Sequence, residues 1–158
     1  MPVDPSPVVL CAASWRPSKN WASTVRPAYE TLIGGATGKV AAYAWADLVM
    51  MMGDTRAAPL ALIVVLHAER VLGSFDDRRL ASHRNLCLMD LGLAHVDGPV
   101  RIAALHDPDV VPTDVPGFEG WLARALIPFD GDLERAAWFA LRTACVRTGV
   151  LDGPDPTP

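Results

Sequence analysis

The apolar run over residues 60–66, Leu-Ala-Leu-Ile-Val-Val-Leu, constrains the fold of this chain more than any other segment. It follows Pro59, is rich in β-branched residues and shows no alternation of apolar and polar side chains. Such a run is typical of a strand that is covered on both faces. Residues 8–13 form a second short apolar run between polar turn residues, and this run also predicts a buried strand.

Helical patterns separate these runs from weaker strand candidates at residues 39–44 and 99–105. The first helix is expected between Thr24 and Gly34, and a second over residues 78–95 after an Asp76 or Asp77 cap. A third begins after Asp114 and Pro116 and has an apolar stripe of Phe118, Trp121, Leu122 and Ala125. The last is expected over residues 133–148 after Asp132. Strands that alternate with helices imply parallel pairing through right-handed crossovers. We therefore predict one α/β domain over residues 8–150, with loosely held ends at 1–7 and 151–158. Its architecture would be a three-layer sandwich with a short, mostly parallel sheet of four or five strands.

A mostly helical protein is the alternative interpretation. Residues 45–53 fit a helix or a buried strand equally well, and periodicity does not distinguish a buried strand from a buried helix in a short apolar run. In this alternative, residues 41–53 and 59–73 are helices and at most one hairpin remains.

Composition and charge exclude several classes of function. The net charge of −4 provides no basic surface for nucleic acid. The apolar run over residues 57–66 is interrupted by Pro59 and is far shorter than the roughly 20 residues that span a bilayer, and residues 1–7 do not resemble a secretory signal. The three cysteines, Cys11, Cys87 and Cys145, have no CxxC spacing. We expect a soluble cytoplasmic protein with reduced, mostly buried thiols, no metal and no cofactor.

Polar side chains follow the predicted strands. They are Ser14, Arg16 and Asn20 after the first strand, His67 and Glu69 after residues 60–66, and His106 and Asp107 after residues 99–105. Because ligands bind outside the carboxyl ends of parallel strands, these groups are expected to face one crevice. Each also has a structural explanation: a solvated capped loop for the first group, a buried imidazole for His67, and an Asp-Pro turn for the last.

Asp90 is the candidate nucleophile. It lies in an apolar stretch of the helix predicted over residues 78–95, on the same face as His83. Burial would raise the pKa of its carboxyl group or require a partner, and a carboxylate in such a pocket can act as a nucleophile or a general base. The alternatives are a surface aspartate or an ion pair with Arg84 or Arg101.

The residues around Asp90 carry a resemblance to a known family. They are Asp90, Gly92, Ala94, Gly98, Pro99 and Val100, together with residues 9–14 and 63–66. This pattern resembles that of the nucleoside 2-deoxyribosyltransferases, which have a Rossmann-like fold similar to that of TIR-like domains. The resemblance implies that Asp90 stands where the family has a nucleophilic glutamate, which attacks the sugar C1′ and releases the base. The chain departs from the family in having Asp for Glu and in lacking a Lys between the Gly and the Pro.

Together these observations predict a domain that binds a nucleoside or nucleotide and cleaves or transfers at its N-glycosidic bond. Asp90 would be the nucleophile, with His67 or Glu69 as the acid or base. The substrate would be held by Ser14, Arg16, Asn20, His106 and Asp107. The alternative is a non-enzymatic assembly or interaction protein, such as a virion or complex component, which five tryptophans and three successive methionines favour. We expect a homo-oligomer.

Overall fold

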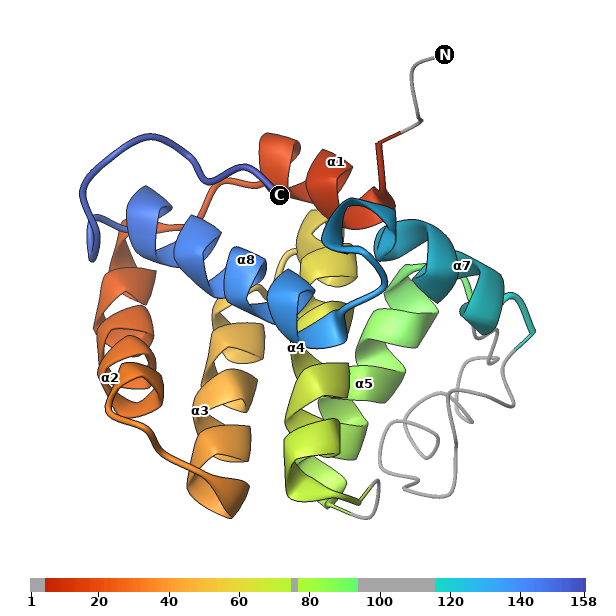
Figure 1. Ribbon diagram of the computed structural model, residues 1–158, viewed down its shortest axis with the longest axis horizontal. Coiled ribbons are helices and arrows are strands. Elements are labelled where there is room, and N and C mark those ends of the chain that lie inside the picture. Colours follow the sequence, from red (N-terminus) through yellow and green to blue (C-terminus); the bar gives the residue numbers. More distant parts are fainter. Residues whose placement is uncertain (1–4, 75–76, 94–115) are drawn as a thin grey trace.

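The chain is described by a computed structural model over residues 5–74, 77–93 and 116–158, and the described residues form an all-helical fold (Figure 1). The α-helices are α1 (Pro7–Ser14), α2 (Ala22–Ile33), α3 (Gly38–Met51), α4 (Ala58–Leu72), α5 (Arg78–Asp90), α7 (Phe118–Ala125) and α8 (Leu133–Arg147). Short 3₁₀ turns are η1 (Lys19–Trp21), η2 (Thr55–Ala57) and η4 (Ile127–Phe129).

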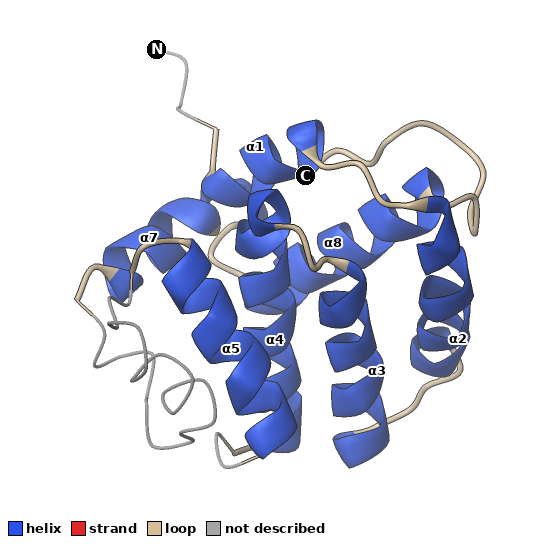
Figure 2. Ribbon diagram, turned by 180° about the vertical axis from the view of Figure 1, so that it is seen from behind, coloured by secondary structure: helices blue, strands red, loops and turns tan. Residues whose placement is uncertain are grey.

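The predicted α/β sandwich is wrong. Figure 2 shows helices and loops but no strand in the described part of the chain. The expected strands at residues 8–13, 39–44 and 60–66 lie in α1, α3 and α4, and the one at 99–105 lies outside the described residues. The Rossmann-like architecture is therefore wrong as well, whereas α3 and α4 match the helices of the alternative interpretation.

Helix α4 is the centre of the fold, and its burial explains the error. Pro59 lies in its first turn, where the missing N–H needs no partner, and Gly73 ends it with a left-handed φ of 75°. All residues from 60 to 69 are buried. Helices α1, α3, α5 and α8 all pack against α4 (Figure 1). Because α4 is covered on all sides, it has no polar face, and the helical period of its apolar residues is lost.

Helix α1 begins at a local signal that the strand prediction missed. Ser6 is its N-cap, and the Ser6 hydroxyl accepts a hydrogen bond from the Val9 N–H at 3.2 Å. Pro7 occupies the first turn. A capping serine followed by proline is a common start of a helix, so Ser6 and Pro7 mark the start of α1.

Two of the predicted helices start where their caps indicated. The Asp77 carboxylate accepts hydrogen bonds from the Arg79 and Leu80 N–H groups at the start of α5. The Asp132 carboxylate accepts one from the Arg135 N–H at the start of α8. Helix α5 ends at Asp90, earlier than the predicted boundary.

Most of the large apolar side chains are buried in the core. Trp45, Met51, Met52 and Trp121 are buried, and the three cysteines are buried free thiols as predicted. Met50 is an exception because it is 56% exposed. Among the described residues, no helix is long and apolar enough to cross a membrane.

Candidate functional site

The predicted site residues that the structure describes do not meet in one crevice. Ser14 ends α1, where its hydroxyl donates to the carbonyls of Leu10 and Cys11. The Arg16 guanidinium donates to the nearby carbonyls of Ala13 and Trp15, and the exposed Asn20 lies in η1. His106 and Asp107 lie outside the described residues. Since the predicted strands within the described residues are helices, this part of the chain has no sheet edge to bring these groups together.

Glu69 lies inside the protein and is paired with Arg84. The Arg84 Nη1 donates to the Glu69 Oε2, and both side chains have an exposure of 0%. Burial raises the pKa of Glu69 to about 7, although the charge and hydrogen bond of Arg84 act in the opposite direction. This carboxyl group ties α5 to α4 and has no access to a substrate.

Asp90 lines a cavity between α3, α4 and α5. This cavity has a volume of about 280 Å³ and includes His83 and Cys87 in its lining, so the predicted common face of His83 and Asp90 is present. Neither His67 nor Glu69 lines it. Burial raises the pKa of the Cys87 thiol to about 12, which makes it a poor nucleophile at neutral pH.

His67 lines a different depression, which we call the Trp138 groove. It has a volume of about 380 Å³ and lies among the C-terminal end of α2, the loop before α3, α3, α4 and the start of α8. Its lining residues are Leu32, Ala36, Thr37, Gly38, Ala41, Trp45, His67, Arg70, Val71, Glu134 and Trp138. A depression of this size and mixed apolar and polar lining is typical of a small-molecule site.

The aromatic residues of the groove hold one another in place. The rings of Trp45 and His67 are 5.0 Å apart between centroids and nearly perpendicular, with an angle of 84° between their planes. Trp45 and Trp138 make a similar contact, at 5.1 Å and 80°. Such edge-to-face contacts are favourable and orient both partners. Trp45 is buried and Trp138 is half-buried, so Trp138 presents indole surface to the groove.

The His67 imidazole has an unmet hydrogen-bonding group. His67 is 6% exposed, and its Nδ1 is a buried atom without a hydrogen-bond partner among the described residues. Burial lowers the pKa of His67, and the nearby Arg70 lowers it further, whereas the charge of Glu134 acts in the opposite direction. The neutral imidazole is therefore favoured at the wall of the groove.

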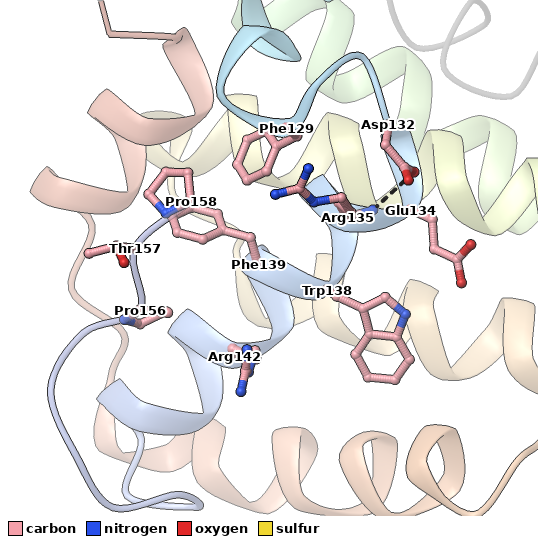
Figure 3. Close-up of a pocket in the computed structure, with 10 residues that line it drawn as sticks. All are labelled: Phe129, Asp132, Glu134, Arg135, Trp138, Phe139, Arg142, Pro156, Thr157 and Pro158. Carbon is pink, nitrogen blue, oxygen red and sulfur yellow. Dashed lines mark hydrogen bonds between the residues drawn. The ribbon is translucent and has the colours of Figure 1, made fainter.

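A larger cavity on α8 offers a less suitable site. It has a volume of about 450 Å³, shares Glu134 and Trp138 with the Trp138 groove and is bordered by Pro156, Thr157 and Pro158. In Figure 3, Trp138 and Glu134 project away from these tail residues. The Arg135 N–H donates to Asp132 and its guanidinium donates to Asp130, so these groups of the cavity are paired within the protein.

The sequence indicated only part of the Trp138 groove. His67 is one of the candidates from the sequence, whereas large aromatic residues such as Trp45 and Trp138 are more often core and Arg70 belongs to no motif. The missed signal was helical spacing: His67 and Arg70 are three residues apart on α4, and Glu134 and Trp138 are four apart on α8. Residues with these spacings share a helix face.

Comparison with known proteins identifies no relative: no family model, no curated protein and no solved structure matches this chain.

Proposed function

We propose that this protein binds a small planar aromatic molecule in the Trp138 groove. The observation that carries the proposal is the buried Nδ1 of His67, which has no partner among the described residues. A buried polar atom without a partner costs about 1–3 kcal/mol, so it requires an explanation. A ligand whose binding turns the edge of the imidazole toward the groove would remove the cost through one hydrogen bond to this nitrogen.

The walls of the groove favour an aromatic ligand. Trp138 is half-buried and lines the groove beside the buried ring of Trp45. Aromatic surfaces pack best against other rings in stacked or edge-to-face arrangements, which add about 0.5–1.5 kcal/mol to the effect of buried area. The groove is also large enough to enclose a single ring system.

The described residues support binding better than catalysis. The Glu69 carboxyl group is buried in its ion pair with Arg84, and Asp90 lines the separate cavity between α3, α4 and α5. His67 therefore has neither of these predicted partners in the Trp138 groove. An imidazole alone can orient a ligand through a hydrogen bond without performing a reaction on it.

A specific observation also favours the second candidate function, an assembly or interaction protein. Met50 and Leu86 are 56% and 40% exposed, and both line the cavity that includes Asp90. Exposed apolar side chains beside an apolar cavity are common where proteins associate. Light scattering coupled to size-exclusion chromatography tests this candidate, which predicts an oligomer that dissociates in the Met50→Lys variant.

Binding of indole, other aromatic heterocycles and nucleosides can be followed by thermal shift and by tryptophan fluorescence. Nucleosides belong in the panel because the sequence predicted them as ligands. We expect saturable stabilisation by at least one aromatic compound, with a Kd on the order of 1 mM or tighter for a ligand of this size.

Two variants make this experiment specific for the groove. Ala36→Leu places a larger side chain in the groove and is expected to abolish binding, whereas the matched control Ala22→Leu changes a half-buried alanine outside it. His67→Leu is expected to weaken binding without reducing the melting temperature, because it removes an unpaired buried nitrogen. Absence of binding by every aromatic compound, or equal binding by the Ala36→Leu variant, would refute the proposal.

A further inference from the structure

The Trp138 groove has one positive and one negative side chain in its lining. Arg70 comes from the last turn of α4, and Glu134 comes from the first turn of α8. Both side chains are exposed. Neither forms an ion pair with another residue in the described segments of the chain. Two opposite charges are therefore available to a ligand in this groove.

Both charges lie close to the aromatic part of the groove. The pKa of His67 is raised by the charge of Glu134 and lowered by that of Arg70, so each charge acts on the imidazole. Glu134 is also four residues before Trp138 on α8, and Arg70 is three residues after His67 on α4. Each charged residue thus shares a helix face with one ring of the groove.

The arrangement favours a ligand with both charges. A purely cationic molecule would pair with Glu134 but would place its charge near Arg70, and a purely anionic molecule would have the reverse problem. A neutral ring would use neither side chain. A zwitterion satisfies both side chains, because a guanidinium group binds a carboxylate through two parallel hydrogen bonds and a carboxylate accepts hydrogen bonds from an ammonium group.

We propose that the ligand of the Trp138 groove is an aromatic α-amino acid. Its ring would pack against Trp138, and an N–H or O–H group of the ring would donate a hydrogen bond to His67. Its ammonium group would pair with Glu134, and its carboxylate would pair with Arg70. This inference rests on the proposed function, because it names the chemical class of the ligand for the same groove. It requires no reaction and no cofactor.

The test compares indole compounds that differ in which charged groups they carry. L-Tryptophan, tryptamine without the carboxylate, indole-3-propionate without the ammonium group, and indole without either are titrated into the full chain by calorimetry. We expect L-tryptophan to bind about threefold to fivefold more tightly than either singly charged compound, because exposed ion pairs contribute modestly. The advantage is expected to fall as salt is added.

Charge-neutral variants assign each contact. Arg70→Gln should weaken the binding of L-tryptophan and indole-3-propionate but leave that of tryptamine unchanged or slightly tighter. Glu134→Gln should weaken the binding of L-tryptophan and tryptamine but leave that of indole-3-propionate unchanged or slightly tighter. Matched controls are Arg124→Gln and Glu119→Gln on α7, which lie outside the groove lining and should change none of the affinities.

The outcomes separate this inference from the proposed function. If indole binds as tightly as L-tryptophan, or if the variants lower all affinities equally, the inference is overturned while an aromatic site remains. If no aromatic compound binds, both the proposed function and the inference are overturned.

Discussion

Replacing Arg84 by methionine should strongly destabilise the protein. Arg84 and Glu69 are both 0% exposed and hydrogen-bonded to one another, so the substitution leaves a carboxyl group buried without its cation. The second carboxyl oxygen, Oε1, already lacks a hydrogen-bond partner among the described residues. Breaking a buried pair in this way typically costs about 3–5 kcal/mol.

Part of the loss depends on the protonation of Glu69. Without Arg84, the pKa of Glu69 rises further above about 7, because the charge and hydrogen bond of Arg84 lower it in the intact protein. Glu69 then folds in its protonated form at pH 7, whereas an ordinary glutamate with a pKa of 4.5 is ionised. The intact protein already bears most of this cost, because a folded pKa of about 7 leaves Glu69 about half protonated at pH 7. The further rise in pKa therefore adds less than about 1 kcal/mol at pH 7, and about 1.4 kcal/mol for each pH unit above 7.

Urea denaturation followed by circular dichroism at pH 7 measures the effect. We expect Arg84→Met to lose about 3–5 kcal/mol and the double variant Glu69→Met/Arg84→Met to recover most of that loss, because apolar replacement of both members of a pair is often neutral or stabilising. Arg78→Met, which changes an exposed arginine on the same helix, is the control and should alter stability by less than about 0.5 kcal/mol.

The pH dependence provides a second measurement. In the Arg84→Met variant, the folded pKa of Glu69 is raised, so its unfolded state releases a proton first as the pH rises from 4.5. The contribution of Glu69 to stability is therefore greatest at and below pH 4.5 and falls as the pH rises to 7 and beyond, whereas the double variant lacks this fall. The reasoning would be refuted if Arg84→Met cost less than about 1 kcal/mol at pH 7, or if the two variants showed the same pH profile.

Two further predictions concern other parts of the molecule. Burial lowers the folded pKa of His67, so the unfolded state binds the proton first as the pH falls below 6.5. Wild type should therefore lose stability relative to His67→Leu between pH 6.5 and 5 in thermal denaturation. A constant difference between the two proteins would contradict the assignment of a buried neutral imidazole. Arg147 donates to the Trp15 carbonyl and to the Asp155 carboxylate. Arg147→Gln should therefore lower the free energy of unfolding by about 1–3 kcal/mol in urea denaturation. Asp155→Asn weakens only the half-exposed ion pair and should lower it by less than about 1 kcal/mol. Equal losses in these two variants would show that the contact with Trp15 contributes nothing.

The helices that the sequence predicted correctly are those with local boundary signals. Asp77 and Asp132 cap α5 and α8 through hydrogen bonds to N–H groups two or three residues later, so the information lies within a few residues of each boundary. The Ser6–Pro7 start of α1 was equally local and was missed only because the apolar run after it was interpreted as a strand.

The candidate site was predictable only in part, because its residues come from distant segments. His67 is predictable from the sequence as a titratable side chain at the end of an apolar run. Its neighbours Trp45 and Trp138 belong to α3 and α8, and no spacing in the sequence relates them to His67. Only the packing of these helices around α4 brings the rings together.

The Asp77 and Asp132 caps, the free thiols and the chemistry of individual side chains could be predicted from the sequence, because these depend on local geometry and residue type. Tertiary structure decided whether residues 60–66 became a strand or a helix, since an apolar run that is buried on all sides is compatible with both. That decision also separated His67 from Glu69. Side chains two residues apart share a face of a strand but lie about 200° apart around a helix, so His67 lines the Trp138 groove and Glu69 is buried against Arg84.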